Sequence, residues 1–193
     1  MTAPESNPAS NPHFGLAPSP WIERFAHLVP PGARVLDAAA GHGRHALLFA
    51  ARGARVTAVD RDAAALATFD VTPGIATRVL DLETGVWPLA GESFDAIVVA
   101  HYLHRPALAL LVDALAPDGA FLYETFAHGN ARYGRPANPD FLLRPYELLD
   151  TVRGRLTVVA FEQGIADNHG RTAVVQRIAA VGAGRPWPPM LSP

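Results

Sequence analysis

The chain has 193 residues, of which 49% are hydrophobic, and a formal net charge of −2. This size and composition predict one globular domain with a full core and exclude a largely disordered chain, while the near-neutral charge disfavours a large nucleic-acid-binding face. The chain has no cysteine, which excludes disulfides, thiolate metal sites and cysteine nucleophiles.

Residues 1–18 are polar and contain four prolines, so we expect a disordered lead-in. They lack the basic and apolar regions of a secretory signal, and no apolar run reaches membrane-spanning length. We therefore expect a cytoplasmic protein without membrane association. A helix is predicted over 21–28, with Ser19 as N-cap and Pro20 at the first helical position.

Short strands and helices alternate from residue 34 onward. Runs such as 96–100 are continuously apolar, which is typical of strands buried on both faces of a parallel sheet. The predicted class is therefore α/β, with a doubly wound, mostly parallel sheet. The predicted strands are 34–39, 55–60, 76–81, 94–100 and 119–126, and the predicted helices are 44–52, 62–69 and 105–116, with a loop over 82–93.

The pattern changes after residue 126. A polar loop over 127–140 precedes a predicted helix over 140–152, followed by strands at 155–163 and 171–181. The loop between these last strands is too short for a crossover, so they must form an antiparallel hairpin and complete a seven-stranded sheet. We expect one domain over 19–181 and a Pro-rich tail over 182–193.

A glycine turn follows the first strand. Asp37 ends the apolar run, Gly41 and Gly43 form the turn, and a helix begins directly afterwards. Glycine lets a ligand approach the backbone, and the helix points its N–H groups at that ligand. A carboxylate at this place suits a positively charged ligand and repels a pyrophosphate. The turn therefore favours S-adenosylmethionine over a dinucleotide.

Three acids, Asp37, Asp60 and Asp81, fall at the ends of successive strands, so we expect them to line one crevice. Asp60 lies 19 residues beyond Gly41, a spacing that suits ribose hydroxyls. Asp81, followed by Leu82, is placed to accept from an exocyclic amine such as that of adenine. Two alternatives remain open at this point: Asp60 could cap the next helix, and Asp81 could sit in a turn.

These segments resemble the class I S-adenosylmethionine-dependent methyltransferases. The resemblance covers about residues 19–181, and its motifs are 35–43, 56–60, 81–82 and 94–99. It implies a Rossmann-like methyltransferase fold that ends in the antiparallel hairpin. The stretch 41–46 is most similar to the bacterial tellurite-resistance and thiol methyltransferase branch. Ala39 stands where many members have glycine, which we expect to be tolerated if its φ is negative.

The resemblance also implies roles in binding S-adenosylmethionine. It implies that Asp37 binds the amino group of the methionine moiety, that Asp60 binds the ribose hydroxyls, and that Asp81 and Leu82 contact the adenine. On charge alone, Arg44 is the candidate for the methionine carboxylate. The complete predicted cofactor site is Asp37, Gly41, Gly43, Arg44, Asp60, Arg61, Asp81, Leu82 and His101.

The acceptor is expected beyond the fourth and fifth strands. Tyr102 and His104 are the candidates for orienting or deprotonating a nucleophile; the alternative is that one of them packs against or caps the helix that begins near residue 105. The sequence here is not the Asn/Asp-Pro-Pro-Tyr/Phe of amino-group nucleic-acid methylation, which argues against that chemistry.

The predicted substrate-binding residues are Tyr123, Glu124, His128, Asn130 and Tyr133. The last three lie in the long loop over 127–140, and loops of this length are usually functional or mobile. The loop could form a lid over the cofactor, contact RNA through its arginines and aromatic side chains, or simply be solvated.

Two His-x-x-His pairs, His42/His45 and His101/His104, could in principle bind zinc. The first pair lies in the cofactor turn, where a metal would compete with methionine, so we predict no metal site.

The predicted function is methyl transfer from S-adenosylmethionine to a small-molecule nucleophile such as a thiol or metalloid. The alternatives are an RNA or protein methyltransferase that uses the 127–140 loop, a cofactor-binding module without transfer activity, and an NAD(P)-dependent oxidoreductase. The last is supported only by the G-x-G-x-x-A pattern over 41–46.

Overall fold

The computed structural model describes residues 17–167, 170–186 and 188–189. Most of the lead-in predicted over 1–18, and part of the tail predicted over 182–193, lie outside these residues. Among the helices that are described, none is long and apolar enough to cross a membrane.

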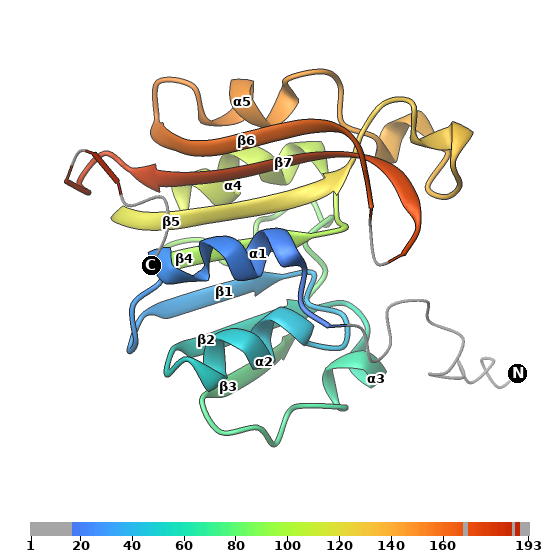
Figure 1. The fold of residues 1–193 in the computed structure, drawn as a ribbon. Helices are drawn as coiled ribbons and strands as arrows, with labels where there is room; N and C mark the ends of the chain where they lie inside the picture. The colour runs from blue at the N-terminus through green and yellow to red at the C-terminus, as the bar shows by residue number, and fades with distance from the viewer. Residues whose placement is uncertain (1–16, 168–169, 187, 190–193) are drawn as a thin grey trace, which may run out of the picture.

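A seven-stranded sheet with the order β3-β2-β1-β4-β5-β7-β6 runs through the centre of the domain (Figure 1). The first five strands pair in parallel, and β7 pairs antiparallel with both β5 and β6. This confirms the predicted doubly wound, mostly parallel sheet with its terminal hairpin. The strands are β1 (Arg34–Ala38), β2 (Arg55–Asp60), β3 (Ile75–Val79), β4 (Phe94–Ala100), β5 (Leu115–Phe126), β6 (Leu156–Asp167) and β7 (Thr172–Gly182).

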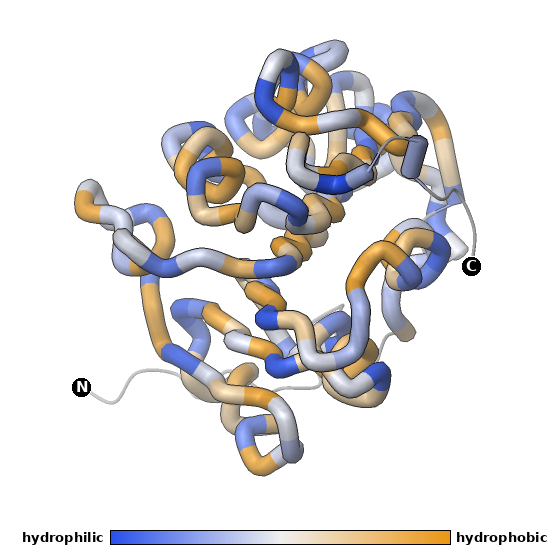
Figure 2. Tube along the Cα trace, turned by 90° about the vertical axis from the view of Figure 1, so that its left-hand side faces the viewer, coloured by the Kyte–Doolittle hydropathy of each residue, from blue (hydrophilic) through white to orange (hydrophobic). Residues whose placement is uncertain are grey.

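Helices cover both faces of the sheet. On one face lie α1 (Pro20–Phe25), α2 (Arg44–Ala51) and α3 (Ala63–Leu66); on the other lie α4 (Arg105–Asp113) and α5 (Glu147–Val152). Each face has its own hydrophobic core, because alternate residues of the buried strands point to opposite sides. Hydrophobic residues accordingly concentrate along the central strands in Figure 2.

The first helix forms as the sequence predicts. The Ser19 side chain accepts hydrogen bonds from the amides of Trp21 and Ile22, and Pro20 occupies the first turn. A short 3-10 turn, Ala26–Leu28, extends the helix to the predicted end. Burial of Trp21, Ile22 and Phe25 fixes the helix against the sheet.

The predicted helix over 140–152 is wrong in its first half. Only Glu147–Val152 is α-helical, and Pro139–Phe141 forms a separate 3-10 turn. Pro145 explains the difference, because a proline inside a helix lacks the amide donor and clashes with the preceding turn. The chain before it is extended instead, and the Leu143 amide donates to the Phe126 carbonyl at 3.0 Å. This contact ties the long loop to the end of β5.

Other boundaries shift by a few residues. The third helix is shorter than predicted and α4 ends at Asp113, whereas β5 begins at Leu115 and both hairpin strands extend beyond their predicted ends. Leu115 is part of β5 because it pairs with Phe94, across an irregularity in the register.

Candidate active site

The glycine turn lies at the carboxyl end of β1 and contains three left-handed residues. The φ angles are +56° at Ala39, +54° at Gly41 and +73° at Gly43. A Cβ on Gly43 would lie 2.6 Å from the ring of Phe69, whereas nothing lies within 4 Å of a Cβ on Gly41. Packing therefore requires the second glycine, and the space beside the first is open.

We expected Ala39 to be tolerated in place of glycine if its φ were negative, but its φ is positive. An L-residue in the left-handed region costs about 1–2 kcal/mol because its Cβ crowds the backbone. Two hydrogen bonds hold the turn in this conformation: the Ala40 amide donates to the Val59 carbonyl at 3.0 Å, and the Gly43 amide donates to Ala40 at 2.9 Å. The turn is thus strained at Ala39 and held by its neighbours.

Asp37 is buried beneath the turn, with 1% of its surface exposed. Its Oδ2 accepts a hydrogen bond from the Ala46 amide, in the first turn of α2, at 2.8 Å. Burial raises the pKa of this carboxyl to about 7; the Ala46 hydrogen bond and the charge of Arg44 oppose the rise, and the charge of Asp60 adds to it. A cation close to Asp37 would favour its ionised form.

A cleft of about 200 Å³ opens beside the turn. It brings together Asp60, Arg61, Asp81, Leu82 and His101 from the predicted cofactor set. It is also lined by Ala39, Leu80, Glu83 and Tyr102. Three carboxylates and one arginine thus meet at the carboxyl ends of β2 and β3, a set of acceptors that suits hydroxyl and amine donors.

The Asp60 carboxylate links the cleft to the glycine turn. Its Oδ2 accepts from the Gly41 amide at 2.8 Å, and its Oδ1 accepts from the Asp62 amide at 2.9 Å. The residue that caps α3 is Asp62, whose side chain accepts from the amides of Ala64 and Ala65. The capping alternative for Asp60 is therefore wrong. Each Asp60 oxygen retains a lone pair for a further donor.

Asp81 bonds within its own loop, where its Oδ1 accepts from the Glu83 amide at 2.8 Å. It therefore does form the turn that we considered, and it lines the cleft as well. The side chain of Arg61 is 70% exposed and lies 4.0 Å from Glu83. Glu83 was not among the predicted site residues, although its position two residues after Asp81 was a usable signal.

Tyr102 lines the cleft, but its phenol is not suited to act as a general base. Burial raises the pKa of its phenol well above the usual range, and the charges of Glu83 and Asp81 raise it further. The hydroxyl therefore stays protonated and does not deprotonate a nucleophile. His104 occupies the N-cap position of α4 without a side-chain capping bond, and it does not line the cleft.

His101 and Arg44 lie together at the β4 end of the site. The His101 backbone is left-handed, with φ +58°, and its ring stacks on Phe126 with centroids 4.9 Å apart. The Nη2 of Arg44 donates to His101 Nδ1 at 3.5 Å. Burial lowers the pKa of Arg44, and the negative charges of Glu124 and Asp37 oppose this shift. A half-buried guanidinium can bind an anion such as a carboxylate.

Glu124 lies two residues before the end of β5, and its side chain is only 3% exposed. Its Oε2 lies 3.1 Å from the Nε of Arg177, and Arg177 lies 3.6 Å from Glu162, which in turn pairs with Arg24 of α1. The Oε1 of Glu124 and the Nε of Arg177 make no hydrogen bond to any described residue. The predicted substrate ligand is therefore a buried member of an ion-pair row.

The remaining predicted substrate residues are scattered. Tyr123 is fully buried on the opposite face of the sheet, and its hydroxyl donates to the Tyr102 carbonyl at 2.7 Å. Asn130 is buried, its amide bonded to Pro136 and Val174. His128 and Tyr133 are on the outer surface of the loop, Tyr133 with 44% exposed. The structure does not bring these four side chains into one pocket.

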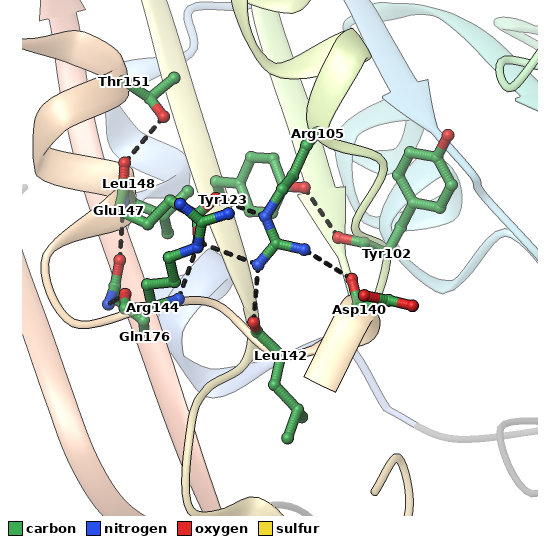
Figure 3. Close-up of polar contacts among 10 residues, drawn as sticks. All are labelled: Tyr102, Arg105, Tyr123, Asp140, Leu142, Arg144, Glu147, Leu148, Thr151 and Gln176. Carbon is green, nitrogen blue, oxygen red and sulfur yellow. Dashed lines mark hydrogen bonds and ion pairs between the residues drawn. The ribbon is translucent and has the colours of Figure 1, made fainter. Parts of the chain in front are cut away.

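Arg105 clamps the loop to α4 (Figure 3). Its guanidinium binds both carboxylate oxygens of Glu147, at 2.7 and 3.1 Å, and donates to the carbonyls of Asp140 and Leu142 at 2.7 and 2.8 Å. The second Glu147 oxygen also accepts from the Arg144 amide at 2.7 Å. This clamp was not predicted, since Arg105 and Glu147 are 42 positions apart and neither belongs to a motif.

No group of three or more His, Asp or Glu side chains among residues 17–167 and 170–186 could hold a metal ion. In the His42/His45 pair, His45 is buried and its Nε2 accepts from the Ser19 amide at 3.1 Å. That imidazole therefore connects α2 to the start of α1.

Comparison with known proteins finds a methyltransferase domain over part of the chain. Residues 35–119 match the family model of a methyltransferase domain, and no curated protein matches the chain significantly. Among solved structures, TehB from Haemophilus influenzae is similar with a TM-score of 0.67 and 18% identity, over 83% of this chain and 60% of that one. This chain thus spans less than two thirds of TehB.

Two further structures are similar over most of both chains. A TehB-like SAM-dependent methyltransferase from Corynebacterium glutamicum has a TM-score of 0.59 and 22% identity, over 87% of this chain and 89% of that one. Coclaurine N-methyltransferase, bound to N-methylheliamine and SAH, has a TM-score of 0.61 and 14% identity, over 82% and 72%. These similarities establish the Rossmann-like methyltransferase fold.

Proposed function

We propose that the chain is a class I S-adenosylmethionine-dependent methyltransferase and that it methylates a small-molecule nucleophile. The observation that carries this proposal is the acidic cleft beside the glycine turn, with Asp60, Asp81 and Glu83 at its wall. Carboxylates accept from hydroxyls and amines and repel phosphates, so this wall suits an adenosine without a pyrophosphate.

The residues around the turn fit the cofactor as a whole. Asp60 and Asp81 offer acceptors to the ribose hydroxyls and the adenine amine, and Gly41 leaves open space where a side chain would otherwise stand. Asp37 supplies a negative charge for the cationic methionine end, and Arg44 supplies a positive one for its carboxylate. The bound sulfonium would supply an activated methyl group, so the protein must mainly bind, orient and exclude water.

A small acceptor is supported by the size of the cleft, which is about 200 Å³. The 127–146 segment is clamped by Arg105 and bonded to β7 through Asn130, so its position is fixed, and none of its residues lines the cleft. Among the similar structures, coclaurine N-methyltransferase is bound to N-methylheliamine, an observation that keeps amines among the acceptors to be assayed beside thiols and metalloids.

The second candidate is an RNA or protein methyltransferase. It is favoured by exposed aromatic side chains on the 127–146 segment, where Phe141 and Tyr146 are 52% and 54% exposed beside Arg132, Arg135 and Arg144. Aromatic and arginine side chains together suit single-stranded nucleic acid. An RNA substrate would use this outer surface of the clamped segment.

Two assays test the proposal in sequence. A thermal-shift measurement should show stabilisation by S-adenosylhomocysteine and none by NADP, since a ligand that binds only the folded form raises its stability. Labelled S-adenosylmethionine should then transfer its methyl group to thiols, metalloid oxyanions or amines and not to total RNA. Binding without transfer to any of these would leave a cofactor-binding module, and transfer to RNA alone would favour the second candidate.

A further inference from the structure

The phenol of Tyr102 is a buried polar group that the fold itself does not use. Its hydroxyl oxygen is inaccessible to solvent and makes no hydrogen bond within residues 17–167 and 170–186. Buried hydroxyls are normally paired, because an unpaired one costs about 1–3 kcal/mol. An unpaired hydroxyl on a cleft-lining residue therefore points to a ligand.

The backbone of Tyr102 is firmly held. Its carbonyl accepts from the Tyr123 hydroxyl at 2.7 Å, and the next residue, Leu103, is buried in the core. In Figure 3 the Tyr102 ring points away from the Arg105 cluster, on the side remote from α5. The backbone that carries the phenol is thus fixed at the wall of the cleft.

The charged groups around the phenol identify its role. The negative charges of Glu83, Asp81 and Asp60 and the positive charge of Arg61 act on it, and all four residues line the same cleft as Tyr102. An ionised carboxylate accepts hydrogen bonds and cannot donate them, whereas the phenol keeps its proton and can donate. This end of the cleft therefore offers acceptors together with one neutral donor.

Adenine has the complementary pattern. Its exocyclic amine donates and its ring nitrogens accept, so it needs a protein acceptor and a protein donor side by side. We propose that the Tyr102 hydroxyl donates a hydrogen bond to a ring nitrogen of the cofactor's adenine, next to Asp81, which accepts from the amine. This proposal rests on the proposed binding of S-adenosylmethionine. It makes Tyr102 a cofactor-binding residue and replaces its predicted part in catalysis.

The substitution Tyr102→Phe removes only the hydroxyl and keeps the ring that packs against the core. The loss of one hydrogen bond to a ligand raises the dissociation constant about tenfold. The matched control is Tyr146→Phe, which removes an equivalent hydroxyl from a side chain that is 54% exposed and does not line the cleft. Thermal melting of the ligand-free variants establishes that both are folded.

Calorimetric titration with S-adenosylhomocysteine and its 1-, 3- and 7-deaza analogues tests the assignment. We expect Tyr102→Phe to bind S-adenosylhomocysteine about tenfold more weakly than the wild type and Tyr146→Phe to bind it equally well. One deaza analogue, lacking the nitrogen that accepts from the phenol, should bind wild type and Tyr102→Phe alike.

Three outcomes would count against these ideas, and they are distinguishable. If the folded wild type does not bind S-adenosylhomocysteine, the proposed function fails first. If wild type and Tyr102→Phe bind it equally, the hydroxyl does not contact the cofactor and the inference is overturned. If the variant weakens all three deaza analogues as much as the parent, the hydroxyl contacts the ribose or another group, and the assignment to a ring nitrogen is overturned.

Discussion

The buried carboxyl of Asp37 should make the stability of the ligand-free protein depend on pH in a specific way. Its pKa is about 7 in the folded protein, against an ordinary value of 3.8. Between these values the folded protein holds a proton that the unfolded chain has lost, so this group's contribution to stability falls as pH rises from about 4 to about 7. The full change is about 4 kcal/mol, at about 1.4 kcal/mol for each pH unit.

The substitution Asp37→Asn isolates this contribution. The amide oxygen of asparagine can still accept from the Ala46 amide, but the side chain no longer ionises. The variant should therefore gain stability relative to the wild type as pH rises. Between pH 5 and pH 8 the difference in free energy of unfolding should grow by about 2–3 kcal/mol, measured by urea unfolding without ligand.

Asp95→Asn is the matched control. Asp95 lies in β4 and pairs with Arg34 at 3.1 Å, an interaction that holds its pKa below the ordinary value. It is ionised in both folded and unfolded chains above pH 5, so its effect on stability should be constant between pH 5 and pH 8. A constant difference for Asp37→Asn as well would refute the raised pKa of Asp37.

The same carboxyl links cofactor binding to proton release. At pH 7 it is about half ionised, and a cationic ligand nearby favours the ionised form, so binding should release up to about half a proton. The binding enthalpy of S-adenosylmethionine should therefore change between two buffers with different ionisation enthalpies. In Asp37→Asn that difference should disappear, and the dissociation constant should rise by about tenfold or more.

Four further substitutions test the turn and the clamp. Ala39→Gly should stabilise the protein by about 0.5–1 kcal/mol in urea unfolding, because glycine relieves the left-handed strain and loses part of the gain as chain entropy. Gly43→Ala should lower the free energy of unfolding by at least about 2 kcal/mol, because the new Cβ would collide with Phe69. Gly41→Ala should lower it by about 1 kcal/mol and should mainly weaken the binding of S-adenosylhomocysteine measured by calorimetry. Equal losses of stability in the two variants would contradict this distinction. Glu147→Gln breaks the bidentate ion pair with Arg105, so it should lower the free energy of unfolding by about 1–3 kcal/mol and speed amide hydrogen exchange over residues 138–147. Unchanged exchange would show that other contacts fix the segment.

Much of the fold could be predicted because its signals are local. The continuously apolar run 96–100 indicated a central parallel strand, and the short loop after residue 163 required an antiparallel hairpin. The helix predicted over 140–152 ran through Pro145, whereas contacts of Leu142 with Arg105 and of Leu143 with Phe126 hold the chain out of a helix there. Such contacts have no local signature.

The site divides in the same way. Asp60 and Asp81 could be placed in one cleft because strand ends in a parallel sheet share an edge. The orientation of Tyr123 could not be foreseen, since its side of the sheet depends on the register of β5 with its neighbours. The pairing of Glu124 with Arg177, which are 53 positions apart in sequence, likewise depends on β5 pairing with β7.

The entry of the chain beside α2 has a practical consequence. The Ala17 carbonyl accepts from Arg44, and the Ser19 amide donates to His45, so both sit against the helix that follows the glycine turn. Since the chain has no cysteine, Ala17→Cys would provide one labelling position, where a fluorophore could report ligand loading. An affinity tag is better fused at the other terminus, because Arg185 donates to the Asp118 carbonyl near the start of β5, at the far end of the sheet.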